Sequence, residues 1–139
     1  MRYDAPPPEW VPELMEGLED DLTGWLESDN PLVAAAKAHF AIVSIHPFAD
    51  GNGRTARLIA DLILERTGWS ADRMLSSSSV LLSRRREYYD ALSETQGPEF
   101  IQRVDVQPFV AFHAEALTHA VAVLEERAIE FSQRNDEIV

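Results

Sequence analysis

The sequence predicts an all-α fold. Along most of the 139-residue chain, apolar side chains recur at spacings of three and four residues, which is the period of an amphipathic helix. No pair of alternating β-branched runs predicts a sheet. The length fits one domain with one sizeable core, so we expect residues 1–139 to form a single unit.

The N-terminal half predicts three helices after a proline-rich lead-in at residues 1–8. The first helix is marked by one apolar stripe: Val11, Leu14, Met15, Leu18, Leu22, Trp25 and Leu26. Asn30-Pro31 is typical of a helix start, with a capping residue before proline at the first helical position. This second helix must end near His46, because Pro47 disfavours helical geometry in the residue before it. The third helix is expected from about Asn52 to Gly68.

The C-terminal half predicts two further long helices. A short helical turn is expected at residues 71–75, and the serines at 76–79 offer caps for a helix that runs to about residue 95. Gly97-Pro98 then breaks the chain, with a short helix expected at residues 99–103. Asp105 and Pro108 open the last long helix, whose apolar stripe runs from Phe109 to Phe131.

Composition excludes several classes of function. The net charge is −12, from 24 acidic and 12 basic side chains. Nucleic acids and anionic membranes both attract basic surfaces, so neither is an expected partner. Cysteine is absent, which rules out disulfides and thiolate chemistry. No signal-peptide run begins the chain and no stretch approaches the ~18 apolar residues of a membrane span. We therefore expect a cytoplasmic protein, or one delivered into a host cell.

The segment with the most chemistry is HPFADGNGRTAR at residues 46–57, a turn that leads into the third helix. Unpaired N–H groups at a helix start, together with the helix dipole, form an anion site. Gly51 and Gly53 allow positive φ and remove Cβ atoms that would block a phosphate. Arg54 and Arg57 lie three residues apart, so they are neighbours on the helix and both are able to donate forked hydrogen bonds to phosphate.

Two further side chains complete this set. A carboxylate at Asp50 would repel a phosphate unless a cation lay between them, and Mg²⁺ held by one carboxylate and substrate phosphates meets that need. His46, at the end of the preceding helix, is suited to take a proton from a hydroxyl near neutral pH. The other histidines, His39, His113 and His119, are expected in structural or surface roles, because no second cluster has metal-ligand spacing.

HPFADGNGRTAR is similar to the HxFx(D/E)GNGRxxR signature of Fic-domain proteins, the Fic/Doc superfamily. The segments PPPEWVPELMEGLEDDL, PLVAAAKAHFAIVSIHPF and RREYYDAL and the final Pro-Phe helix also resemble the family. The resemblance implies a Fic-type helical bundle. It also implies transfer of AMP from ATP to a Ser, Thr or Tyr hydroxyl of a target protein.

By the same resemblance, His46 is the general base and Asp50 is the Mg²⁺ ligand. Phe48 is expected to anchor the loop in the core. The residues expected to bind the nucleotide are Phe48, Gly51, Asn52, Gly53, Arg54 and Arg57. Doc-like kinases of the superfamily carry lysine where Gly53 stands, so Gly53 favours AMP transfer. Tyr88 and Tyr89 are expected to pack the bundle, with contact between one of them and the nucleotide left open.

Two parts of the family pattern are missing from these residues. The β-hairpin flap that presents the target commonly precedes the proline-rich stretch, so we expect either that most of it lies before Met1 or that the flap is built differently. No (S/T)xxxE(G/N) helix supplies the inhibitory glutamate that pairs with the second arginine, here Arg57. Inhibition would then come from a missing segment or an antitoxin-like partner. A homodimer, another nucleotide or phosphodiester donor, and a non-catalytic interaction module remain open alternatives.

Overall fold

The computed structural model describes residues 2–69 and 75–138, and over these ranges the fold is all-α, as predicted. The elements in chain order are a 3₁₀ turn, η1 (Pro8–Trp10), and the helices α1 (Val11–Ser28), α2 (Pro31–Ile45), α3 (Asn52–Arg66), α4 (Ser77–Ser83), α5 (Arg85–Gln96) and α6 (Gln107–Ile138). Within the described ranges the β-structure consists of an isolated parallel bridge between Asp4 and Glu99.

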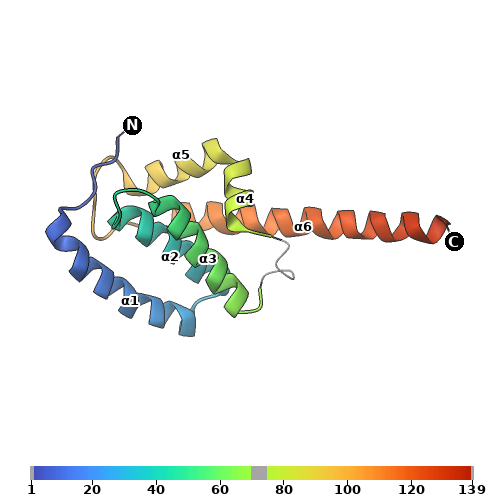
Figure 1. Ribbon diagram of the computed structural model, residues 1–139, viewed down its shortest axis with the longest axis horizontal. Helices are drawn as coiled ribbons and strands as arrows, with labels where there is room; N and C mark the ends of the chain where they lie inside the picture. The colour runs from blue at the N-terminus through green and yellow to red at the C-terminus, as the bar shows by residue number, and fades with distance from the viewer. Residues whose placement is uncertain (1, 70–74, 139) are drawn as a thin grey trace.

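Helix α2 lies at the centre of the bundle (Figure 1). It packs against α3 most extensively and also against α1 and α6, while α4 contacts α3 and α6. Four of its alanines are almost fully buried: Ala34, Ala35, Ala36 and Ala38. Small side chains allow neighbouring helices to approach closely, and burial continues to Ser44 and Ile45 at the C-terminal end of α2. The turn that follows α2 is therefore built on the best-packed element of the fold.

The predicted helix starts are confirmed by their capping contacts. The Asn30 side chain accepts a hydrogen bond from the Leu32 N–H at 2.9 Å, with Pro31 at the first helical position of α2. Ser76 caps α4 by accepting from the Ser79 N–H at 3.1 Å. Asp105 accepts from the Gln107 N–H at 3.0 Å, where α6 begins.

The predicted helix at residues 76–95 is wrong in one respect, because the structure divides it into α4 and α5. The break falls at Arg84, whose φ of −114° and ψ of 41° are not helical. The guanidinium of Arg84 pairs with Glu87 of α5 and with Glu115 of α6, and it stacks over the Phe112 ring. This change of direction lets α4 reach α3 while α5 packs along α6 (Figure 1).

The predicted short helix at residues 99–103 is also wrong. This segment runs beside the N-terminus, where the Asp4 N–H donates to the Pro98 carbonyl at 2.9 Å and the Phe100 N–H donates to the Asp4 carbonyl at 3.0 Å. The Pro98 carbonyl and the Phe100 N–H are bonded to Asp4 of the N-terminal segment, so they are not available for hydrogen bonds within a local helix. The turn predicted at residues 71–75 lies almost entirely outside the described residues.

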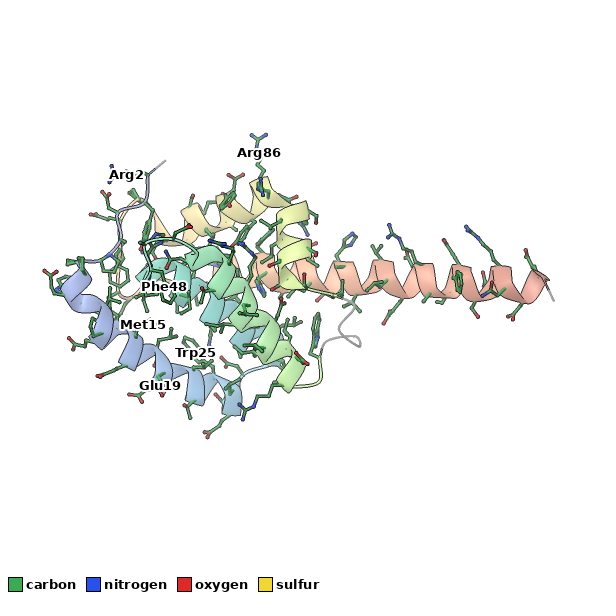
Figure 2. All side chains as sticks on the ribbon, viewed as in Figure 1. Arg2, Met15, Glu19, Trp25, Phe48 and Arg86 are labelled. Carbon is green, nitrogen blue, oxygen red and sulfur yellow. The ribbon has the colours of Figure 1, made fainter. Side chains whose placement is uncertain are left out.

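Helix α6 continues well past the bundle (Figure 1). From residue 125 to residue 137 every side chain is exposed, and Figure 2 shows them extending into solvent around the helix. The apolar stripe therefore packs only in the first part of the helix, and Phe131, expected on that stripe, is 68% exposed. No helix within residues 2–69 and 75–138 is long and apolar enough to cross a membrane.

Candidate functional site

The turn between α2 and α3 begins with His46 in a left-handed backbone conformation. Its φ and ψ are both 54°, and it is the only non-glycine residue with positive φ among the described residues. Its N–H still donates to the Ile42 carbonyl at 2.9 Å, so it closes α2. Proline at 47 disfavours the right-handed helical region for the residue before it. The exposed imidazole is therefore held at the rim of the turn.

Tyr3 lies against this histidine from the N-terminal segment. The two ring centroids are 6.1 Å apart, and the Tyr3 hydroxyl donates to the Ser44 carbonyl at 2.6 Å. Burial raises the pKa of Tyr3 to about 12, so this hydroxyl stays protonated and keeps donating. The hydrogen bond ties the N-terminal segment to the last turn of α2, next to His46.

Asn52 fixes the shape of the turn. Its side-chain oxygen accepts from the Phe48 N–H at 2.9 Å, and its side-chain nitrogen donates to the Phe48 carbonyl at 2.8 Å. The prediction that Phe48 anchors the loop in the core is wrong, because its side chain is 49% exposed at the turn (Figure 2). The loop is anchored through the main chain of Phe48 and the buried amide of Asn52.

The two glycines serve different purposes. Gly51 caps α3 with a φ of +87°, as predicted, whereas Gly53 lies inside the first turn of α3 and does not have positive φ, against prediction. A Cβ at Gly53 would lie 3.1 Å from Nη1 of Arg57, and one at Gly51 would lie 3.4 Å from Nη2 of Arg54. The absent Cβ at Gly53 therefore leaves room for Arg57, whereas glycine is needed at 51 for its positive φ.

The two arginines occupy different environments. Arg54 forms an ion pair with Asp50 at 3.1 Å, and both side chains are exposed, at 73% and 92%. Arg57 is only 8% exposed. Its Nε donates to the Ser78 hydroxyl at 3.1 Å, and no ion pair of Arg57 is formed within residues 2–69 and 75–138. A buried guanidinium without a carboxylate partner is poised to accept an anion.

Behind Arg57 lies a buried pair formed by Tyr88 of α5 and His39 of α2. The Tyr88 hydroxyl and Nε2 of His39 are 2.7 Å apart. Burial raises the pKa of Tyr88, while hydrogen bonding from Arg57 opposes that rise. Burial also holds the pKa of His39 well below its usual value, with His113 and Arg57 adding to the effect. His39 is therefore neutral at physiological pH.

The remaining histidines lie away from the turn. His113 of α6 is fully buried, with its ring centroid 5.5 Å from that of His39, and neither of its ring nitrogens has a partner in the described part of the chain. His119 is exposed on α6. Across the described ranges no three His, Asp or Glu side chains gather as metal ligands.

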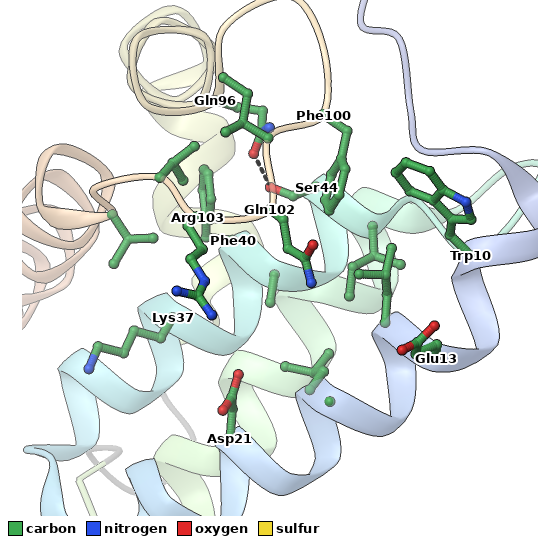
Figure 3. A pocket seen from close by; sticks show the side chains of 18 of the residues that line it. Trp10, Glu13, Asp21, Lys37, Phe40, Ser44, Gln96, Phe100, Gln102 and Arg103 are labelled. Carbon is green, nitrogen blue, oxygen red and sulfur yellow. Dashed lines mark hydrogen bonds between the residues drawn. The ribbon is translucent and has the colours of Figure 1, made fainter.

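A separate cavity of about 700 Å³ lies between α1, α2 and the segment that follows α5 (Figure 3). Asp21, Lys37, Gln102 and Arg103 are among its polar lining, and Trp10 lies at one side. None of its lining residues belongs to the 46–57 segment. The cavity and the turn are therefore distinct features of the surface.

Comparison with known proteins identifies the family. Residues 1–64, which include the whole 46–57 segment, match the family model described as the Fic/DOC family. The chain belongs to the Fic/DOC family. Its Fic segment holds all eight residues that the sequence assigned to the site, and the structure places them in one turn and the first two turns of α3.

Curated relatives of this Fic chain carry the name protein adenylyltransferase. The relative from Caenorhabditis elegans, fic-1, is 35% identical over 125 residues, covering 83% of this chain and 21% of the relative. The relative from Nematostella vectensis is 32% identical over 123 residues, covering 85% of this chain and 26% of the relative. The chain thus spans about a quarter or less of the length of these proteins.

Solved structures share the Fic fold. A Fic family protein from Desulfovibrio desulfuricans has a TM-score of 0.69 and 38% identity, covering 89% of this chain and 36% of its own. A Fic domain containing signaling protein from Bacteroides thetaiotaomicron has a TM-score of 0.70 and 26% identity, covering 86% of this chain and 47% of its own. The Fic-type helical bundle expected from the sequence is confirmed.

The residues that surround Arg57 in this Fic site were not predicted from the sequence. Ser78 was expected only as part of a capping loop, and Tyr88 as bundle packing. Neither lies in the 46–57 segment. Ser78 reaches Arg57 because α4 packs on α3, and Tyr88 reaches it from α5, where its hydroxyl also contacts His39 of α2. A run of four serines and a tyrosine pair carry no local signal for such contacts.

Proposed function

We propose that this chain is the Fic unit of a protein adenylyltransferase, which transfers AMP from ATP to a Ser, Thr or Tyr hydroxyl of a target protein. The observation that carries the proposal is the pairing of an exposed base with a buried cation at one helix end. His46 stands at the rim of the turn, and Arg57, without a carboxylate partner among the described residues, lines the start of α3. The names of the curated relatives support the same activity.

In this proposal His46 acts as the general base. The target hydroxyl oxygen attacks the α-phosphorus of ATP, the bond between that phosphorus and the bridging oxygen to the β-phosphate breaks, and pyrophosphate leaves. The hydroxyl proton passes to the His46 imidazole. The left-handed backbone of His46 and the Tyr3 ring fix the direction from which the imidazole approaches the hydroxyl.

The start of α3 would hold the phosphates. The N–H groups of its first turn have no partner within the helix, and the dipole adds positive potential there. Arg57 is preorganised by burial and by Ser78, whereas Arg54 is exposed and would exchange its Asp50 partner for phosphate. Donors that are already in place when negative charge develops stabilise the transition state most effectively.

Asp50 fits a single-carboxylate Mg²⁺ site. Its side chain is 92% exposed at the mouth of the turn, and the described residues offer no ready-made cage of three acidic or histidine ligands nearby. Mg²⁺ in nucleotide sites usually takes one or two carboxylates and completes its shell with phosphate oxygens and water. Bound Mg²⁺ would neutralise phosphate charge, and Asp50 would hold it against the nucleotide.

The test of the proposal is labelling of protein by ATP that carries the label in its α-phosphate, with Mg²⁺ and a cell lysate. Wild-type protein is expected to label a lysate protein, and His46→Ala is expected to abolish labelling. His119→Ala is the matched control, because His119 is exposed on α6 far along the chain from the turn.

Mass spectrometry of the labelled protein then identifies the transferred group. An added AMP on a hydroxyl side chain is expected. Undiminished labelling by His46→Ala would overturn the role of the base, and a different added mass would overturn AMP as the transferred group.

A further inference from the structure

Arg57 is enclosed on several sides, although it lies at a site that must admit a ligand. Gly53 leaves space beneath the guanidinium, Ser78 of α4 accepts from Nε, and Tyr88 of α5 lies beside it. The main chain at this point is fixed too, because the Ser77 hydroxyl donates to the Arg57 carbonyl at 2.9 Å. A long flexible side chain is thus held by three helices.

Hydrogen-bond accounting shows why this enclosure matters. A guanidinium has five N–H donors and no acceptor, and leaving them unpaired when buried is costly. The described residues give Arg57 two neutral oxygens, from Ser78 and Tyr88, and no carboxylate. The two neutral oxygens orient the guanidinium without cancelling its charge, so the remaining donors stay available for an anion.

Tyr88 is itself locked in place. It is 1% exposed, stacks on Tyr89 with ring centroids 5.2 Å apart, and contacts Phe109 of α6. Its hydroxyl shares a hydrogen bond with Nε2 of the neutral His39 over 2.7 Å, and the same oxygen accepts a hydrogen bond from Arg57. The Tyr88 oxygen lone pairs then face Arg57. His39 is held in turn by ring contacts with Phe109 and His113.

We propose that Tyr88 is a positioning residue for Arg57: its hydroxyl, oriented by His39 and assisted by Ser78, aims the buried guanidinium at the anion site on α3. The proposal rests on the proposed function, in which Arg57 binds nucleotide phosphate. In this arrangement, residues of α2, α5 and α6 set the orientation of an arginine that belongs to α3. Tyr88 makes no contact with the nucleotide in this arrangement.

Tyr88→Phe removes the hydroxyl and keeps the ring packing. ATP affinity, measured by titration calorimetry without target protein, is expected to fall by about tenfold, the scale of one hydrogen bond to a charged group. AMP, which lacks the β- and γ-phosphates, is expected to bind with nearly unchanged affinity. Tyr89→Phe is the matched control, since Tyr89 is 51% exposed.

A double-mutant cycle separates positioning from general structural damage. In an Arg57→Ala background, Tyr88→Phe is expected to leave the ATP affinity unchanged, because no guanidinium remains to be oriented. An equal loss of ATP affinity in both backgrounds would overturn the proposal.

A spectroscopic measurement keeps the proposal testable without catalysis. The Arg57 Nε–H resonance of isotope-labelled protein is expected to shift and to exchange faster with solvent in Tyr88→Phe and in Ser78→Ala. Ser78→Ala is the positive control, because Ser78 accepts directly from Nε. If Tyr88→Phe fails to fold, His39→Gln carries the same measurement. An Arg57 resonance that is unaltered in the folded variant of Tyr88 or His39 would overturn the proposal. Loss of nucleotide binding in wild type would overturn the proposed function and leave this readout intact.

Discussion

The backbone of His46 is strained because His46 directly precedes Pro47. A left-handed conformation in a residue with a Cβ costs ~1–2 kcal/mol, and glycine escapes this cost. The structure accepts it at His46, where Pro47 closes off the helical alternative. Strained backbone of this kind clusters at functional sites, in agreement with the role proposed for His46.

The strain at His46 predicts a difference in stability between two variants of this residue. His46→Gly is expected to be more stable than His46→Ala by about 1 kcal/mol, because alanine keeps the strained φ and glycine relieves it. Urea unfolding of the two variants measures the difference, and both are expected to lack transferase activity. Equal stabilities would show that the turn relaxes when the imidazole is removed.

Replacement of Gly53 by alanine is expected to have opposite effects on stability and on nucleotide binding. Alanine is favoured over glycine inside a helix by about 1 kcal/mol, so Gly53→Ala is expected to preserve or raise the unfolding free energy. The new Cβ would lie 3.1 Å from Nη1 of Arg57 and displace it, so ATP affinity is expected to fall. Gly24→Ala on α1, where a Cβ meets nothing within 4 Å, is the control and is expected to raise stability only.

His113 predicts a dependence of stability on pH. Burial lowers its pKa to about 4, so the unfolded chain, with a pKa near 6.5, binds more protons in acid. The stabilising effect of neutral His113 is complete above about pH 6.5 and is lost as the pH falls towards 4. Between pH 8 and pH 5 the loss is on the order of 2 kcal/mol.

Replacement of His113 tests this dependence. His113→Leu keeps an apolar side chain in the core and is expected to lose less stability between pH 8 and pH 5 than wild type, as measured by urea unfolding at both pH values. His119→Leu, on the exposed side of the same helix, is expected to behave like wild type. An identical pH profile for His113→Leu and wild type would contradict the assignment.

At the scale of helices, the sequence predicted those elements whose ends have local chemistry. Asn30-Pro31, Gly51 and Asp105 each mark a boundary through capping or φ, and the structure places helix ends at these points. The residues of the 46–57 segment are contiguous, so their placement together in one turn before α3 was also predictable. No local sequence signal predicts the break between α4 and α5 at Arg84, because this break depends on contacts of Arg84 with Glu115 and Phe112 of α6.

The same distinction explains the errors inside the site. Phe48 was assigned to the core by resemblance, yet only its main chain is held, and the holding group is the side chain of Asn52. The roles of Ser78 and Tyr88 depend on the packing of α4 on α3 and on the contact of Tyr88 with His39 of α2, which no local pattern encodes. Contacts between helices that lie far apart in the sequence could therefore not be predicted and are known only from the structure.

At the scale of the whole molecule, the net charge of −12 surrounds a site proposed to bind an anion. If the proposed function holds, the long-range field would repel ATP, while Arg54, Arg57 and the start of α3 would attract it at short range. Salt screens interactions beyond the Debye length, about 8 Å at physiological ionic strength, and affects close contacts less. The association rate of ATP, measured by stopped flow, is therefore expected to rise from low to physiological salt. A falling rate would mean that attraction dominates at long range.

The free half of α6 has a hydrodynamic consequence. Residues 125–138 add about 20 Å of helix beyond the bundle at 1.5 Å per residue. A compact chain of this length has a radius of gyration of about 14 Å, so solution X-ray scattering of the monomer is expected to give a larger value. The molecule should also tumble anisotropically, because it turns faster about the α6 axis than across it. Truncation after residue 124 is expected to bring both properties close to those of a sphere.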